Sequence, residues 1–179
     1  MESFRFSRPA FGVLAAVGLA GVAIAPARAN DCADLLDVLK GMTKLTYHQS
    51  VSRVASDGKT TGGQIVQTPS ARYVEVRGVW HKLPTATEEF LRKAETMVAQ
   101  GKMTCQRKGN DTLNGKTAVV YAVHSDGGDN PWSDSKVWVE SGQRLLKSES
   151  KSDGAMTTSQ YDYDKVEVPT NAVPLGQTK

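Results

Sequence analysis

The stretch SKVWVESGQRLLKSESKSDGAMTTSQYDYDKVEV, residues 135–168, decides the fold. Nearly every second side chain in it can face water, which is typical of strands that have one solvated face. The dipeptides Ser141-Gly142 and Asp153-Gly154 favour tight turns, so consecutive strands should pair antiparallel. The stretch therefore predicts a β-meander with too few large apolar side chains to close a core by itself.

Further segments with strand character precede the meander. Asp57-Gly58 and Asn114-Gly115 favour hairpin turns, and Gly78 predicts a bend or bulge within its strand. The eight predicted strands are residues 45–54, 62–68, 72–83, 103–107, 117–125, 136–140, 145–150 and 156–168. In strand 117–125 both alternating sets of side chains are apolar, so we expect this strand to be covered on both faces.

Two segments have helical periodicity. Asp31 can cap the first, whose apolar residues recur at helical spacing until Gly41. Thr85 and Glu88 form a capping box for the second, which carries the apolar stripe Phe90, Leu91, Ala94, Met97 and Val98. The predicted fold class is α+β: an antiparallel curved sheet, or open half-barrel, of about eight strands with two helices covering its concave face.

The N-terminal residues are typical of an export signal. Arg5 and Arg8 precede an apolar run over 11–25, and Ala27-Arg28-Ala29 is a small-x-small cleavage site. The run is shorter than the roughly 20 apolar residues that a membrane anchor needs. We therefore predict a signal peptide over residues 1–29, cleaved after Ala29, and a single periplasmic domain over residues 30–179.

Charge and cysteine content restrict the function of the mature chain. Cleavage removes three basic residues and one acidic residue, so the formal net charge falls from +3 to +1 and gives no reason to expect nucleic acid. The two cysteines, Cys32 and Cys105, should form one disulfide in an oxidising compartment. Neither has the neighbours that a redox or metal site needs.

No group of residues predicts catalysis strongly. Three histidines lie on different predicted strands without metal-binding spacing: His48, His81 and His124. Asp126, Asp129 and Asn130 form an acidic loop that resembles a calcium site but has few ligands. Asp162 and Asp164 share one strand face. Neighbouring carboxylates of this kind are more typical of a solvated strand edge than of a catalytic acid and base pair.

Two stretches resemble the superfamily of the outer-membrane lipoprotein carrier (LolA-like). LTYHQSVSRVASDGKTTGGQIVQTPSARYVEV, residues 45–76, is similar to that family's first hairpin: an aromatic-x-Gln strand start, an Asp-Gly turn, and a proline followed shortly by an arginine. KVWVESGQRLLKSESKSDGAMTTSQYDYDKVEV, residues 136–168, resembles its closing meander. The resemblance covers about residues 44–168 and implies an open half-barrel whose helices cover an apolar cavity for acyl chains.

The resemblance also implies a role for Arg72, which matches the arginine that latches lid and barrel in the carrier. The sequence departs from the carrier family in two segments. Residues 77–84, RGVWHKLP, stand where the carrier has a Gly-Lys-aromatic strand. Residues 166–176, VEVPTNAVPLG, stand where the carrier has a phenylalanine-rich, proline-containing stretch. A disulfide from the first helix to the sheet would also restrain a lid. An apolar-ligand cavity is still expected, but lipoprotein trafficking itself is not implied.

We therefore expect a periplasmic, non-enzymatic carrier or sensor that binds an apolar acyl-chain ligand, lipid or lipoprotein, as a monomer without cofactor or metal. The expected lining residues point to covered faces, with Arg72 at the rim: Val74, Val76, Trp80, Phe90, Leu91, Met97, Val119 and Tyr121. Two alternatives stay open. In the first, the protein is an interaction module for an envelope partner, and the same residues fill a solid core. In the second, it is a hydrolase that uses the aspartates.

Overall fold

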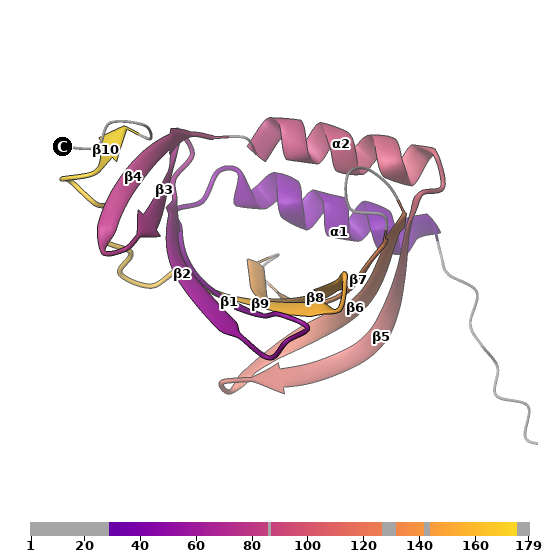
Figure 1. The fold of residues 1–179 in the computed structure, drawn as a ribbon. Coiled ribbons are helices and arrows are strands. Elements are labelled where there is room, and N and C mark those ends of the chain that lie inside the picture. Colours follow the sequence, from indigo (N-terminus) through magenta and orange to yellow (C-terminus); the bar gives the residue numbers. More distant parts are fainter. Residues whose placement is uncertain (1–28, 86, 127–131, 142–143, 175–179) are drawn as a thin grey trace, which may run out of the picture.

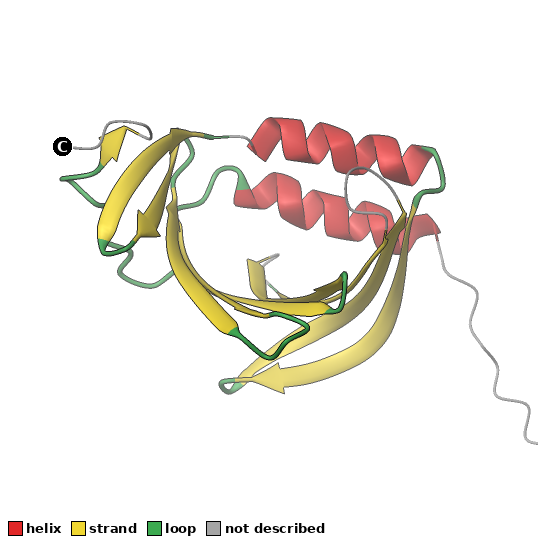
Figure 2. Ribbon diagram, viewed as in Figure 1, coloured by secondary structure: helices red, strands yellow, loops and turns green. Residues whose placement is uncertain are grey.

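The structure is a computed structural model that describes residues 29–85, 87–126, 132–141 and 144–174. Residues 1–28 of the predicted signal peptide, and Asp129 and Asn130 of the acidic loop, lie outside the described residues. The described part forms one strongly curved sheet with two helices lying side by side across its open side (Figures 1 and 2). This arrangement confirms the predicted α+β class.

The described residues form two helices and ten strands. The helices are α1 (Ala29–Met42) and α2 (Thr87–Ala99). The strands are β1 (Tyr47–Val54), β2 (Thr60–Gln67), β3 (Ala71–Val76), β4 (Val79–Pro84), β5 (Met103–Leu113), β6 (Lys116–Asp126), β7 (Trp132–Glu140), β8 (Arg144–Ser152), β9 (Ala155–Asp162) and β10 (Val173–Pro174). They lie in the order β10-β4-β3-β2-β1-β9-β8-β7-β6-β5, and only β10 and β4 pair in parallel.

The prediction of about eight strands is wrong for two reasons. The predicted strand 72–83 is a hairpin, because Arg77 and Gly78 have φ angles of 52° and 80° and turn the chain back. Two consecutive residues in the left-handed conformation are typical of a type I′ hairpin turn. Glycine is favoured there because it has no Cβ to clash with the backbone. The short strand β10, beyond the predicted meander, adds the tenth.

Two bulges interrupt the regular pairing of the sheet. One lies on β5 between Arg107 and Gly109, and the other places Leu146 out of register between β8 and β7. A bulge bends its strand and reverses which face the following residues occupy. As a result Leu145 and Ser148 both face the helices, while Leu146 packs on the outer face of the sheet.

The main core lies between α1 and the inner face of the sheet. Its buried members come from α1 and from β5 to β8: Cys32, Leu35, Val38, Met42, Cys105, Tyr121, Val123, Val137, Val139 and Leu145. The predicted disulfide between Cys32 and Cys105 is confirmed, with Cα atoms 5.0 Å apart. Arg107 N–H donates a 2.9 Å hydrogen bond to Asp31 Oδ2, so Asp31 binds β5 from within the first turn of α1 instead of capping the helix.

The outer face of the sheet has a smaller core of its own. Ala118, Val120 and Trp138 are buried there, with Leu113 and Leu146 packed against them. Strand β6 is therefore covered on both faces, as predicted from its sequence. A second outer cluster forms around Val66, Ala71 and Tyr73 of β2 and β3. Trp80 and two residues of the C-terminal segment, Val166 and Ala172, pack against it.

Helix α2 is held more loosely than α1. Ala94 is its only buried side chain among the described residues, and Phe90 is 57% exposed. Lys40 Nζ of α1 lies 2.9 Å from Glu95 Oε1 of α2, a pair that is about half exposed on both sides. Such exposed pairs contribute little, so packing of the apolar stripe is the main force that holds α2 in place.

Candidate functional site: a cavity between the helices and the sheet

A cavity of about 700 Å³ lies between the two helices and the inner face of the sheet. Pockets for small molecules commonly have volumes of about 300 to 1,000 Å³. Both helices and eight strands contribute to its walls: Leu35, Leu39, Met42, Tyr47, Gln49, Gln67, Arg72, Thr87, Phe90, Leu91, Lys93, Ala94, Met97, Met103, Val123, Ser125, Ser135, Val137, Leu145, Ser148, Ser150 and Tyr161. The concave face is hollow at this place.

The helical side of the cavity is mainly apolar. Leu35, Leu39 and Met42 of α1 lie one helical turn apart, and the stripe of α2 supplies Phe90, Leu91, Ala94 and Met97. These positions share one face of each helix because residues three or four apart lie above one another. Methionine and aromatic side chains adapt to irregular apolar partners, so this wall suits a flexible hydrocarbon.

The sheet side of the cavity is mixed in character. Val123, Val137 and Leu145 supply apolar surface near α1, whereas Ser148, Ser150 and Gln49 supply polar surface farther along the curved sheet. Ser148 and Ser150 face the cavity because the bulge at Leu146 changes the phase of β8. The cavity therefore has an apolar wall facing a partly polar one.

Gln67 connects the sheet to the segment that leads into α2. Its side chain is 6% exposed, and Nε2 donates to Thr68 O at 2.7 Å, Ala71 O at 3.3 Å and Thr85 Oγ1 at 3.3 Å. Thr85 Oγ1 also accepts from the backbone N–H of Thr87 at 3.4 Å, at the start of α2. Gln67 thereby fixes where α2 begins relative to the cavity.

Arg72 reaches the cavity from β3, opposite Gln67 in the β2–β3 pair. Its Nε is buried and has no hydrogen-bond partner among the described residues. Burial raises the pKa of Tyr47 to about 12, an effect that the Tyr161 hydroxyl reinforces and the charge of Arg72 opposes. Burial also raises the pKa of Tyr161. Hydrogen bonds with Ser148 and Ser159 and the charge of Arg72 lower it by less. Both phenols are therefore neutral near pH 7.

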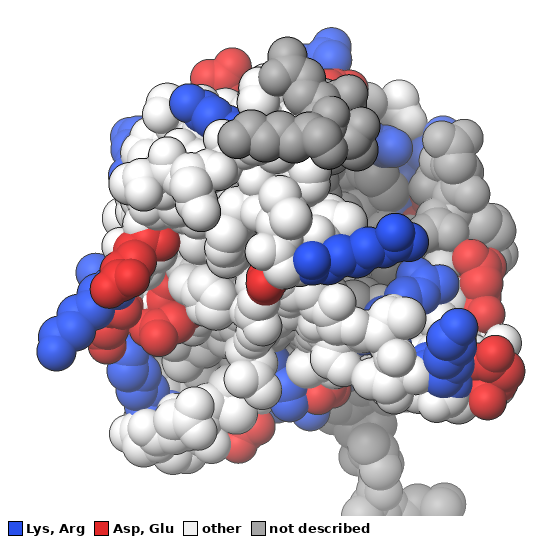
Figure 3. Space-filling model, turned by 60° about the vertical axis from the view of Figure 1, so that its left-hand side comes forward, with Lys and Arg blue, Asp and Glu red and all other residues white. Residues whose placement is uncertain are grey.

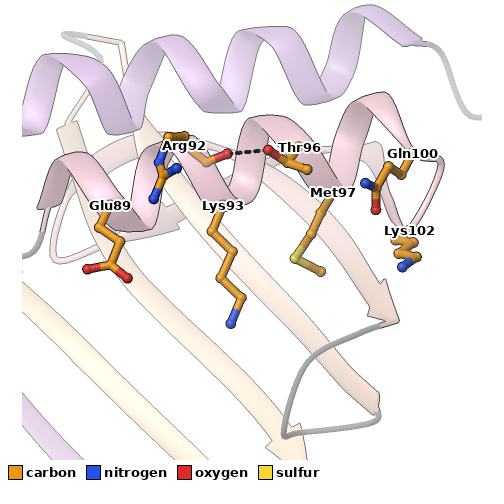
Figure 4. A pocket seen from close by; sticks show the side chains of 7 residues that line it. All are labelled: Glu89, Arg92, Lys93, Thr96, Met97, Gln100 and Lys102. Atoms are coloured by element: carbon orange, nitrogen blue, oxygen red, sulfur yellow. Dashed lines mark hydrogen bonds between the residues drawn. The ribbon is translucent and has the colours of Figure 1, made fainter.

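A shallower depression of about 360 Å³ adjoins the cavity along α2 (Figure 4). Apart from Met97, the residues that line it have polar or charged side chains: Glu89, Arg92, Lys93, Thr96, Met97, Gln100 and Lys102. Lys93 and Met97 also line the main cavity, so the two spaces meet along one side of α2. Charges of both signs are interspersed on the face shown in Figure 3, without a broad patch of a single sign.

The structure brings together some of the nine predicted ligand-binding residues. Arg72, Phe90, Leu91 and Met97 line the cavity. The other five do not line it: Val74, Val76, Trp80, Val119 and Tyr121. Whether any of the nine binds a ligand stays a prediction.

Local packing explains where four of those five residues lie. Val76 is 44% exposed beside the Arg77-Gly78 turn, and Trp80 packs on the outer cluster with Tyr73. Tyr121 is buried in the main core, and Val119 packs against that core. Apart from Arg72, the sequence prediction missed the polar lining residues, although the alternation Ser148-x-Ser150 is a sign of a strand face that avoids a dry core.

The described residues contain no group of three or more His, Cys, Asp or Glu side chains placed to hold a metal ion. His124 Nδ1 lies 2.7 Å from Asp134 Oδ1 in an exposed pair on β6 and β7. Asp162 accepts a hydrogen bond from the backbone N–H of Asp164 at 2.9 Å and is exposed. None of these four residues lines the cavity, so the candidate site is the cavity and not a cluster of titratable groups.

Comparisons with known proteins identify the fold. No protein-family model matches the chain, and no curated protein matches its sequence. LprF from Mycobacterium bovis is similar in structure, with a TM-score of 0.50 and 14% identity, covering 81% of this chain and 98% of LprF. The Mycobacterium tuberculosis lipoprotein LppX is similar with a TM-score of 0.51 and 11% identity, covering 79% of this chain and 97% of LppX.

A LolA superfamily protein from Nitrosomonas europaea is also among the structural matches, with a TM-score of 0.25 and 10% identity, covering 78% of this chain and 95% of that chain. Neither helix in the described part of the chain is long and apolar enough to cross a bilayer. The predicted open half-barrel fold is confirmed by the similarity to LprF and LppX, and at these identities the likeness extends to the fold alone.

Proposed function

We propose that the protein is a periplasmic, non-enzymatic carrier or sensor that binds an apolar acyl-chain ligand, lipid or lipoprotein, between its two helices and the sheet. The observation that carries this proposal is the cavity of about 700 Å³ with an apolar helical wall. A well-packed domain leaves few voids larger than a water molecule, so a hollow of this size in the concave face needs an explanation. Binding of a hydrocarbon chain supplies one.

The fold supports the proposal without identifying a ligand. LprF and LppX share the open sheet with this chain, and LppX is a lipoprotein. The disulfide is consistent with an oxidising compartment outside the cytoplasm. Phe90, a large apolar side chain that is 57% exposed, stands at the wall of the cavity. An aromatic ring left in water beside an apolar hollow is well placed to cover a bound chain.

The alternative function is a protein-interaction module that binds an envelope partner and no lipid. One observation favours it: α1 packs on the sheet through a buried core, so only part of the half-barrel is hollow. The two functions differ in what enters the cavity, and a ligand-binding experiment separates them.

The test is calorimetric titration of delipidated protein with a soluble long-chain amphiphile, together with native mass spectrometry of protein purified from the periplasm. We expect saturable binding and a co-purifying lipid. The variant Ala94→Trp places a large ring at a buried lining position and should abolish binding. Ala99→Trp, at an exposed position on the same helix, is the matched control and should bind as the parent does.

Melting temperatures of both variants show whether they remain folded. If the parent protein neither binds the amphiphile nor carries a lipid, the carrier function is wrong and the interaction module survives. Equal binding by the two tryptophan variants would mean that the ligand occupies another place.

A further inference from the structure

The charges in the cavity have one sign. Among its lining residues only Arg72 and Lys93 are charged, and both are cationic. In a cavity that binds only hydrocarbon, an unpaired cation would destabilise the folded protein, because a charge in an apolar space loses its hydration. The walls offer no carboxylate to offset the two cations.

Arg72 is the more unusual of the two cations. No ion pair among the described residues includes it, and its buried Nε lacks a hydrogen-bond partner among them. Two other buried side-chain atoms are also without partners, Gln64 Oε1 and His81 Nδ1, but neither residue lines the cavity. Arginine stays charged at every physiological pH, so Arg72 cannot relieve the cost by losing a proton.

Neutral hydrogen-bonding groups surround Arg72 instead of acids. Tyr47 and Tyr161 lie close enough for their pKa values to respond to its charge, and both remain protonated because burial raises those values. Gln49 Nε2 donates to Tyr161 Oη at 3.4 Å, which orients the phenol. This end of the cavity therefore presents a cation with uncharged polar side chains, whereas the wall formed by α2 is apolar except for Thr87 and Lys93.

We propose that the ligand is an anionic amphiphile whose carboxylate or phosphate headgroup pairs with Arg72 while its hydrocarbon chain lies against α1 and α2. This inference rests on the proposed function, since it specifies the headgroup of the same ligand. A guanidinium binds carboxylate and phosphate oxygens through two parallel N–H donors, and the bond is strong where water is excluded. Lys93, exposed on α2 where cavity and outer depression meet, attracts the same anion from solvent (Figure 4).

The experiment compares headgroups on one chain length. Delipidated protein is titrated calorimetrically, below the concentration at which micelles form, with decanoic acid, decyl phosphate and 1-decanol, and separately with acetate and inorganic phosphate. We expect both anionic amphiphiles to bind about tenfold or more tightly than the alcohol, because a site that pairs a charge disfavours an analogue without it. The free anions should show no saturable binding, since they lack the chain.

Three variants locate the preference. Arg72→Gln should remove the preference for the anions while alcohol binding persists, and Arg72→Lys should restore part of it. Arg53→Gln removes an exposed arginine of β1 that does not line the cavity, and it should keep the full preference. Melting curves of the variants check that each is folded.

Each other result overturns the inference. Equal affinity for acid and alcohol in the parent protein, or a preference that persists in Arg72→Gln, would exclude Arg72 as the headgroup site. Equal weakening of acid and alcohol in Arg72→Gln would make Arg72 a latch for α2. Acetate or phosphate binding as tightly as the amphiphiles would indicate an anion site independent of the chain. If none of the amphiphiles binds the parent protein, the proposed function itself fails.

Discussion

Gln67 donates a hydrogen bond to Thr85 and so joins the end of β2 to the segment that enters α2. The same amide nitrogen bonds two backbone carbonyls of the β2–β3 turn, those of Thr68 and Ala71. One buried side chain thus holds together a turn and the start of a helix that lies next to the cavity.

Replacing Gln67 by methionine tests this relationship. The change keeps the volume but removes the donor, and loss of a buried hydrogen-bonding group costs about 1–3 kcal/mol. We expect the free energy of unfolding to fall by that amount in urea denaturation. Gln160→Met, at an exposed position on β9, is the matched control and should leave stability within about 0.5 kcal/mol of the parent.

The disulfide should contribute strongly to stability. Cys32 and Cys105 are separated by 73 residues, and removing a native disulfide from a small exported domain typically costs about 2–5 kcal/mol. A reductant should therefore lower the melting temperature of the parent protein. The double variant Cys32→Ala/Cys105→Ala should melt at that lower temperature and should not respond to reductant. A parent melting curve that is the same with and without reductant would contradict this prediction.

Ala94 is the point at which α2 is packed against the rest of the protein. It is 3% exposed, so Ala94→Asp would bury an unpaired carboxylate and should destabilise the fold by about 3 kcal/mol or more. Ala99→Asp places the same charge at an exposed position of α2 and should have little effect. Denaturation midpoints of the two variants measure the difference. If the two midpoints coincide, α2 does not pack through Ala94.

The buried tyrosines should ionise late in an alkaline titration. Burial raises the pKa of Tyr47 to about 12, and burial is also the main cause that raises the pKa values of Tyr121, Tyr161 and Tyr163. Absorbance of the phenolate at 295 nm should therefore show that most of the five tyrosines titrate above pH 10 while the protein is folded. In denaturant the same residues should titrate near pH 10.

These tyrosines also predict how stability depends on pH. The folded-state pKa of Tyr47 lies above its unfolded value of 10.0, so the folded state holds the proton more tightly. The resulting stabilisation is fully present below pH 10 and is lost as the pH rises toward 12. Tyr47→Phe removes this proton and should flatten the fall in stability over that range.

The sequence predicts the large-scale architecture because local patterns encode it. Asn114-Gly115 and Asp153-Gly154 adopt left-handed turn conformations, as their residue types predict, and the apolar stripe at Phe90, Leu91, Ala94 and Met97 forms one face of α2. Turn chemistry and helical periodicity depend on neighbours along the chain, so they can be recognised without coordinates.

The cavity was only partly predictable because it depends on contacts distant in sequence. Arg77 has no strong turn preference, so the sequence predicts one strand over residues 72–83 where the structure has a hairpin. Trp80 consequently lies on the outer surface and not, as predicted, at the cavity. The bulge at Leu146 likewise places Ser148 and Ser150 in the cavity, and it arises from pairing with β7. Whether a face is hollow or filled depends on volumes contributed by many elements, which periodicity does not measure.

The two helices above the cavity are fastened to the sheet unequally. Helix α1 is bonded covalently to β5 and contributes much of the main core, whereas α2 buries one alanine among the described residues and otherwise makes partly exposed contacts. A helix or strand with few buried apolar contacts has low local stability. The free energy needed to open it is a small fraction of the free energy of global unfolding. Displacing α2 breaks no strand pairing, so a hydrocarbon chain can reach the cavity by local opening of one helix while the sheet and the disulfide-bonded helix remain folded.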